Sequence, residues 1–167
     1  AVESIIDGSG GEALVASGAD VSLQAVTVFG SVDVLSLNAD NSIFTGQVMA
    51  KRTQQGCVRF SYLPEGSTAP RRYRCQPEMA LAGISDPLER DIKGSRVAPF
   101  FRSMTYGRPG YAQLDPAGAT EILEGAEDGS EMGALGILKG SLRISDLETA
   151  LDEYLRPGMD AGIFYED

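Results

Sequence analysis

The side chains that could do chemistry in this chain are mainly carboxylates, because its 167 residues include no histidine. Without histidine, Ser-His-Asp and Cys-His catalysis and histidine-containing zinc sites are excluded. Glycoside cleavage needs two carboxyl groups held at a defined separation. Asp7, Asp33 and Asp40 lie in or beside expected strands but do not recur at equivalent positions. The sequence therefore predicts no catalytic residue.

A second group of carboxylates lies in the glycine-rich run GAEDGSEMG at residues 125–133. Carboxylate oxygens on a flexible loop are ligands that Ca²⁺ accepts. The spacing does not match an EF-hand loop, and the simpler interpretation is a mobile, solvated acidic loop. We predict no metal site and no cofactor, and calcium bound by residues 121–131 is the one alternative that these residue types allow.

The basic residues concentrate in a short band. Residues 51–74 contain six Lys and Arg side chains against the single acid Glu65. Because Arg and Tyr are favoured at protein interfaces, part of this band is predicted to contact a partner. The predicted partner patch consists of Arg59, Tyr62, Arg71, Arg72, Tyr73 and Arg74. The alternative is that the tyrosines pack inward and the arginines pair with acids of the same chain.

The overall charge limits the classes of partner. The formal net charge is −10, and residues 1–50 hold six acids and no Lys or Arg. Such a surface repels phosphate groups, so nucleic acid and anionic membranes are excluded as general partners. No apolar run approaches the ~20 residues that a membrane-spanning helix needs. The predicted partners are therefore a protein or a glycan, without membrane insertion, and the composition is compatible with a homo-oligomer.

Two cysteines flank a segment that is predicted to form a β-hairpin over residues 57–75. Residues 58–62 and 71–74 alternate in type, and a loop with proline and glycine separates them. Folding about Gly66 would place Cys57 opposite Cys75. That geometry permits a disulfide without requiring one, and a disulfide would indicate an oxidising compartment.

A short apolar motif recurs along residues 1–62. Its copies are residues 4–8, 27–30 and 42–46, with a weaker copy at 57–60. Ile43 follows Val28 by 15 residues and Val58 follows Ile43 by 15, whereas the first interval is longer. Recurring short strands with turn residues between them are typical of a solenoid, in which equivalent side chains stack. We therefore predict a mainly β chain with a short parallel β-helix; an antiparallel sandwich is the alternative.

The remaining residues, 76–167, are predicted to be mostly irregular. Residues 99–106 are compatible with one more strand, and residues 117–140 with a surface loop that has a helical turn near 119–123. The whole chain is expected to form one domain.

One helix is predicted near the C-terminus, where Ser145 and Glu148 form a capping-box pattern. Pro157 and Gly158 end it, and residues 161–165 are predicted to form a closing strand. This helix and strand together are expected to cap the open edge of the sheet. The first coil shows no cap, so residue 1 is expected to lie within a longer protein.

Several segments resemble the C-terminal part of large, mostly uncharacterised bacterial proteins. These segments are Val28–Gly30, Ser42–Gly46, Gly56–Tyr62, Pro70–Pro77, Gly110–Leu114 and Gly125–Gly133. The resemblance implies a right-handed β-helix and an association with gene neighbourhoods of phage-tail-like contractile particles. It implies no catalytic residues. The sequence departs from the family pattern at Ala134–Gly140, where the family continues with aromatic and histidine-containing residues.

These features favour a structural or adhesion module, the C-terminal part of a larger bacterial β-helical protein in a surface or tail-like assembly. The alternative is a carbohydrate-active β-helix that binds or cleaves a polysaccharide. A third hypothesis is a scaffold that docks an acidic protein through the basic band. No signal peptide is visible at Ala1–Ser4, and the hypotheses favour an extracellular or particle-associated location.

Overall fold

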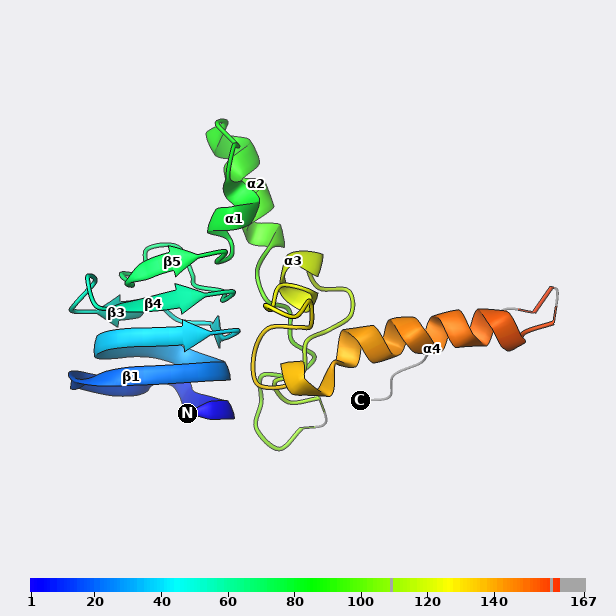
Figure 1. Cartoon of the computed structure of the whole chain (residues 1–167), viewed down its shortest axis with the longest axis horizontal. Helices are drawn as coiled ribbons and strands as arrows, with labels where there is room; N and C mark the ends of the chain where they lie inside the picture. The colour runs from blue at the N-terminus through cyan, green and yellow to red at the C-terminus, as the bar shows by residue number, and fades with distance from the viewer. Residues whose placement is uncertain (109, 157, 160–167) are drawn as a thin grey trace.

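A computed structural model describes residues 1–108, 110–156 and 158–159. Within these ranges the chain forms one curled sheet followed by short helices (Figure 1). The strands are β1 (Val2–Asp40), β2 (Ile43–Phe44), β3 (Val48–Ala50), β4 (Gly56–Arg59) and β5 (Arg71–Tyr73). The helices are α1 (Glu78–Leu81), α2 (Pro87–Arg96), α3 (Thr120–Leu123), the 3₁₀ helix η1 (Gly136–Leu138) and α4 (Gly140–Tyr154).

The long strand β1 is curled and not straight. Its 39 residues would span ~130 Å if they were extended. The amide of Gln24 nevertheless donates to the carbonyl of Ala1 at 3.0 Å. The chain bends where Ala25 and Gly30 adopt φ angles of 50° and 125°. β1 therefore winds around an apolar interior and meets its own beginning before the later strands join it (Figure 1).

All pairings between the named strands are parallel. β1 pairs with β2 and β3 at an offset of 16 residues, with Val32 opposite Val48. It pairs with β4 at an offset of 19, with Asn38 opposite Cys57, and β4 pairs with β5 at an offset of 14, with Cys57 opposite Arg71. The prediction of parallel strands in a mainly β chain is confirmed as a curled parallel sheet, and the antiparallel sandwich is wrong.

The chain turns repeatedly at single residues in the left-handed conformation. Five of these residues, at positions that match the strand pairing, are Glu3, Ala25, Asn41, Phe60 and Arg74, with φ between 46° and 50°; Ser9, between the first two, also has a φ of 50°. The intervals between the five are 22, 16, 19 and 14 residues, and the last three equal the pairing offsets. We call these five residues the corners and the chain between two corners a pass. The first interval is longer, as expected, but the regular 15-residue spacing is wrong because the loops between strands differ in length.

At the corners Asn41 and Phe60, the serine that follows closes the corner with its side chain. Ser42 Oγ donates to the carbonyl of Asp40 at 2.8 Å and accepts from the amide of Val26 at 3.1 Å. Ser61 repeats this one pass later, since its Oγ donates to the carbonyl of Arg59 at 2.6 Å. The same hydroxyl accepts from the amide of Ser42 at 3.0 Å. These buried hydroxyls satisfy backbone groups that a bending strand leaves without partners.

Apolar side chains fill the inside of the curled sheet. Val28, Phe44 and Leu63 occupy successive passes and are buried there. On the other side of the same strands, Phe29 and Ile43 belong to a second core cluster with residues between 97 and 132. The C-terminal segment therefore packs against the outside of the sheet (Figure 1).

The predicted hairpin over residues 57–75 is wrong. β4 and β5 run parallel, and Cys57 lies opposite Arg71 and not opposite Cys75. Tyr62, between the two strands, also pairs in parallel with Ile43 of the preceding pass. The chain completes another pass, which covers the open edge of the pass before it and buries Leu63 in the core.

The region after β5 begins with two helices that the sequence did not predict. α1 and α2 lie beyond β5, at the end of the sheet opposite the N-terminus (Figure 1). The carboxylate of Asp86 accepts from the amide of Leu88 at 3.3 Å at the start of α2, and Pro87 occupies its first turn. An Asp-Pro start is a known helix signal, but the high proline content of residues 76–116 obscured it.

The other predictions for residues 76–167 are met in part. The helical turn expected near residues 119–123 is α3, whereas residues 99–106 contribute only isolated bridges. α4 begins at Gly140, so Ser145 lies inside the helix and is not its N-cap. Contrary to the predicted cap, α4 projects away from the sheet (Figure 1). The predicted strand at 161–165 lies outside the described residues.

In the part of the chain that the structure describes, no helix is both long enough and apolar enough to cross a bilayer.

Gly46 lies at another bend of the sheet, where two backbone segments approach closely. Substituting this glycine tests the close approach. A Cβ there would lie 2.4 Å from the carbonyl carbon of Gly30, which cannot move aside as a side chain can. Gly46→Ala is expected to lower the free energy of unfolding by about 1–3 kcal/mol in urea denaturation. Gly18→Ala is the matched control, because a Cβ there meets nothing within 4 Å, and it should change stability by less than ~0.5 kcal/mol. Equal effects of the two substitutions would contradict the close approach.

Candidate functional site

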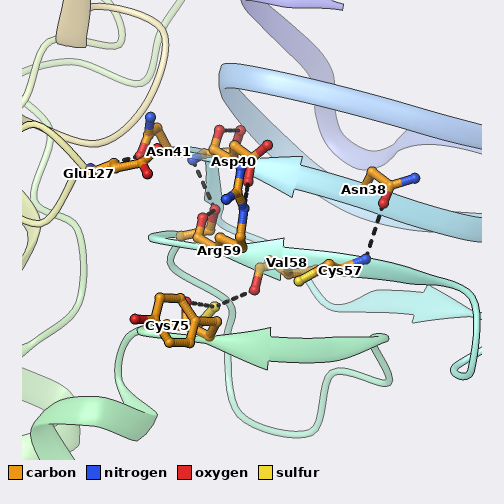
Figure 2. Close-up of polar contacts among 11 residues, drawn as sticks. Asn38, Asp40, Asn41, Cys57, Val58, Arg59, Cys75 and Glu127 are labelled. Carbon is orange, nitrogen blue, oxygen red and sulfur yellow. Dashed lines mark hydrogen bonds and ion pairs between the residues drawn. The ribbon is translucent and has the colours of Figure 1, made fainter.

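Two arginines of the predicted partner patch are paired within the chain. Arg59 forms an ion pair with Asp40, with Nε 2.7 Å from Oδ1 (Figure 2). This hydrogen bond raises the pKa of Arg59. Arg72 pairs with Glu78 and donates to the carbonyl of Ser67 at 2.5 Å. For these two residues the alternative interpretation, internal pairing, is confirmed.

The other patch residues differ in exposure. Tyr62 is half-buried against the second core cluster, and burial raises the pKa of its hydroxyl. Tyr73 is 49% exposed, and its ring meets Phe60 edge-on with centroids 5.7 Å apart. The guanidinium of Arg74 lies 5.8 Å from the centroid of Tyr73, a cation–π distance. With exposed Arg71, these residues leave a small cationic and aromatic surface beside β5.

Cys75 takes the place at a corner that serine holds in earlier passes. It follows a corner residue, as Ser42 and Ser61 do. Its Sγ lies 3.3 Å from the carbonyl oxygen of Val58 and 3.6 Å from that of Tyr73 (Figure 2). Burial raises the pKa of this thiol. Cys75 is therefore a structural residue of the sheet.

Cys57 lies on the opposite side of the sheet. It precedes the buried Val58 in β4, and successive side chains of a strand point to opposite faces. Both cysteines are free thiols in the structure. An outward thiol and an inward thiol cannot be joined without moving the backbone, so the disulfide that the hairpin would have permitted is not formed.

The strand acids that were considered for glycoside cleavage have partners. Asp7 Oδ2 accepts from the hydroxyl of Tyr111 at 2.6 Å, and this bond lowers the pKa of Asp7. Asp33 Oδ2 accepts from Ser17 Oγ at 2.8 Å, and Asp40 holds the ion pair of Figure 2. Each contact joins residues that are far apart along the chain, so these carboxylates stabilise the fold.

The acidic run at residues 125–133 is not the solvated loop that the sequence predicted. Its second half is buried. The corner residue Asn41 accepts from the amide of Glu127 on Oδ1 at 2.9 Å (Figure 2). The main-chain carbonyl of Asn41 accepts from the amide of Gly133 at 2.8 Å. The run packs against the sheet because it completes the hydrogen bonds of an exposed corner.

The same run was the candidate calcium site. Among the residues that the structure describes, no three His, Cys, Asp or Glu side chains are grouped closely enough to hold a metal ion. Asp128 accepts from Ser130 Oγ at 2.5 Å and lies 3.4 Å from the ammonium of Lys139. These contacts, chiefly those with Ser130, lower the pKa of Asp128. Calcium binding was the alternative to the predicted absence of a metal site, and it stays untested.

A groove of about 880 Å³ opens beside the first passes of the sheet. Its sides include Asp7, Glu12, Gly30, Gly46, Met104 and Tyr106. We call it the Tyr106 groove. Of the described residues that line it, two carry a carboxylate and none is Lys or Arg. The groove therefore has a negative charge and an apolar side.

Aromatic contacts support the Tyr106 side of the groove. Tyr106 is 83% exposed, and its ring meets Tyr111 edge-on with centroids 5.5 Å apart. Tyr111 packs against Phe29 of β1 at 5.6 Å. Burial, followed by the hydrogen bond to Asp7, raises the pKa of Tyr111 to about 12. The Tyr111 hydroxyl therefore keeps its proton at neutral pH and continues to donate to Asp7.

The sequence did not single out Tyr106 or Tyr111 as site residues, and it named Glu131 only as one acid of the run at residues 125–133. Tyr106 and Tyr111 flank a turn, and no local pattern shows that Tyr111 meets a residue 104 positions earlier. The available signal in the sequence was a pair of tyrosines on either side of a turn that contains glycines. No local pattern showed that Glu131 would be buried, because Glu is rarely buried in proteins.

Comparisons of this chain with protein-family models, curated proteins and solved structures find no match. The likeness to bacterial β-helix proteins therefore stays an expectation.

Native thiol labelling distinguishes the two cysteines. Cys75 is 3% exposed, and buried thiols react slowly. A thiol reagent is therefore expected to label Cys57 in the folded protein and Cys75 only after unfolding, as measured by mass spectrometry. Cys75→Ser puts a hydroxyl in place of the thiol at the corner and should leave native labelling unchanged, whereas Cys57→Ser should abolish it. Absence of free thiols in unfolded, unreduced protein would show that a disulfide exists.

The buried position of Glu131 predicts that the free energy of unfolding depends on pH. Glu131 is 5% exposed beside Gly140, where α4 begins. Burial raises the pKa of its carboxyl from the ordinary 4.5 to about 7, so the folded chain holds this proton more tightly than the unfolded chain does. The free energy of unfolding should fall as pH rises between these two values, by about 3 kcal/mol at most.

Urea denaturation at about pH 5 and about pH 8 measures this effect of Glu131. Glu131→Gln is neutral at both pH values and should remove this part of the pH dependence. Glu153→Gln, on an exposed position of α4, is the matched control and should retain it. The explanation by burial fails if Glu131→Gln keeps the wild-type pH dependence.

Proposed function

We propose that this chain is a structural binding module. It would be the C-terminal part of a larger bacterial right-handed β-helix protein that belongs to a surface or tail-like assembly and contacts a protein or a glycan. The observation that carries the proposal is the repetition of left-handed corners with parallel pairing between passes. Stacking of this kind is what a solenoid needs, because each pass buries its apolar face against the next.

A stack of passes suits a binding role because it holds outward side chains at a fixed spacing. Neighbouring strands lie ~4.8 Å apart, and buried hydroxyls at Ser42 and Ser61 connect the passes. Two outward surfaces are available for a partner: the cationic and aromatic surface beside β5 and the Tyr106 groove. Rigid surfaces lose little conformational entropy on binding.

Several observations support binding over cleavage. The chain has no histidine, and Asp7, Asp33 and Asp40 have partners within the fold. Glu131 has the raised pKa expected of a general acid. The cavity that Glu131 lines measures only about 20 Å³, which is too small for a sugar.

The alternative function is a carbohydrate-active β-helix that cleaves its ligand. Asp7 and Glu12 both line the Tyr106 groove, and a glycosidase needs two carboxyl groups. One of them must be protonated at the working pH. The hydrogen bond from Tyr111 lowers the pKa of Asp7, so Asp7 is not that acid. We keep binding as the main proposal and test cleavage directly.

The proposal is tested on the full-length protein in the bacterium that encodes it. The protein is expected to fractionate with the cell surface or with contractile particles, detected by immunoblotting and immunogold electron microscopy, while a cytosolic marker stays soluble. Recovery of the protein only as a free cytosolic monomer would overturn the proposal.

Turnover assays on the same preparation address the alternative. Neutral polysaccharides, polygalacturonate and peptide libraries are expected to stay intact with and without millimolar Ca²⁺. Release of products that is lost in Glu12→Gln or Asp7→Asn would establish the cleaving alternative instead. The wider set of acids to replace, should any activity appear, is Asp33, Asp40, Glu127, Asp128 and Glu131.

A further inference from the structure

The Tyr106 groove combines an exposed aromatic ring with carboxylate acceptors. Tyr106 is 83% exposed, and Asp7 and Glu12 line the same groove. A pyranose has an apolar face of C–H groups and a rim of hydroxyl donors. An aromatic ring gives the apolar face a flat surface to pack on, and carboxylates are strong acceptors for hydroxyl groups. We infer that the groove binds a chain of neutral sugars, an inference that rests on the proposed binding function.

The charge of the groove selects against acidic ligands. Asp7 and Glu12 bring negative charge, and the described lining residues include no Lys or Arg to offset it. The hydrogen bond from Tyr111, followed by that from the amide of Ser9, lowers the pKa of Asp7, so its carboxylate stays ionised at neutral pH. A uronate, sulfate or phosphate group would meet repulsion, whereas a neutral sugar would not.

Stacked glycines form part of the lining of the groove. A Cβ on Gly30, whose φ is 125°, would lie 2.3 Å from the carbonyl oxygen of Gly11. Gly46 has no room for a Cβ above Gly30. Glycine at these stacked positions lets the backbones of neighbouring passes approach, and it adds no side chain to this part of the lining. At about 880 Å³ the groove is near the upper end of the ~300–1,000 Å³ range of ligand sites, so it accommodates more than one sugar unit.

The sides of the groove are held in place before any ligand arrives. Tyr111 supports the Tyr106 ring, packs on Phe29 and donates to Asp7. These contacts connect the first pass, the part of β1 around Phe29 and the segment around residue 106. A preorganised aromatic surface binds more tightly because less freedom is lost on binding.

The inference is tested by a glycan array followed by calorimetry on the purified chain. The probes are unbranched cello-, laminari-, manno- and N-acetylated chito-oligosaccharides, with polygalacturonate as the acidic arm and polylysine as the cationic arm. At least one neutral oligosaccharide is expected to bind, and polygalacturonate is expected to bind at least ~tenfold more weakly.

Substitutions connect the binding to the groove. Tyr106→Ala is expected to weaken binding of the neutral oligosaccharide about tenfold, and Glu12→Gln should weaken it as well. Tyr154→Ala is the matched control, because Tyr154 is 87% exposed on α4 and does not line the groove, and it should bind as the wild type does. The inference is overturned if no neutral oligosaccharide binds, if Tyr106→Ala binds as tightly as the wild type, or if polylysine is the only ligand.

Two measurements on the wild-type protein separate this inference from the proposed function. Sugar binding is measured on the purified chain, and assembly is measured by fractionation of the full-length protein. A wild-type protein that assembles but binds no neutral sugar refutes the inference alone. A wild-type protein that binds sugar but stays a free cytosolic monomer refutes the proposed function alone.

Discussion

The left-handed corner is the constraint on which the rest of the sheet depends. A residue other than glycine in this conformation costs about 1 kcal/mol or more, yet the chain adopts it at Ala25, Phe60 and Arg74 as well as at Asn41. The corner redirects the strand within one residue, so the parallel pairing can continue on both sides of it. The next side chain, Ser42 in one pass, then satisfies the backbone groups that the bend sets free. Without this hydroxyl the corner would leave buried polar groups unpaired, which is a larger cost.

The corners also determine where the C-terminal segment packs. Asn41 offers a side-chain oxygen and a carbonyl oxygen to the amides of residues 125–133, and Thr27 of the adjoining strand accepts from the amide of Ala134 at 3.0 Å. Gly133 permits this approach, since its φ is 92° and a Cβ would lie 2.5 Å from Thr27 Oγ1. The segment is therefore held against the same strands whose other side forms the core, which places the ring of Tyr106 beside the first pass.

The parts of this fold that the sequence predicted are those with a local signal. The short apolar motif predicted at residues 42–46 begins with Ser42, whose hydroxyl closes a corner. The parallel pairing inferred from this motif is present. The copy assigned to Cys57 belongs at Ser61, and the following one is Cys75, in which sulfur replaces the hydroxyl oxygen. A corner at Phe60 has no local signal at all, because an aromatic residue rarely adopts positive φ. The predicted hairpin failed for this reason: two alternating segments joined by a loop look the same whether the chain reverses or continues around the sheet.

The candidate site was less predictable because its parts come together only in the folded chain. The first fifty residues hold acids without any basic side chain, and they give the Tyr106 groove its negative charge, while Arg71 and Arg74 lie by β5 at the far end of the sheet (Figure 1). The sequence showed this separation of charge, but only the order of the strands reveals that it becomes a separation in space. Every pass between the two ends is paired in parallel and packed on one core, so the two surfaces lie at opposite ends of one sheet. A ligand in the Tyr106 groove would therefore not contact a partner bound beside β5, and the binding module that we propose has two separate surfaces for its partners.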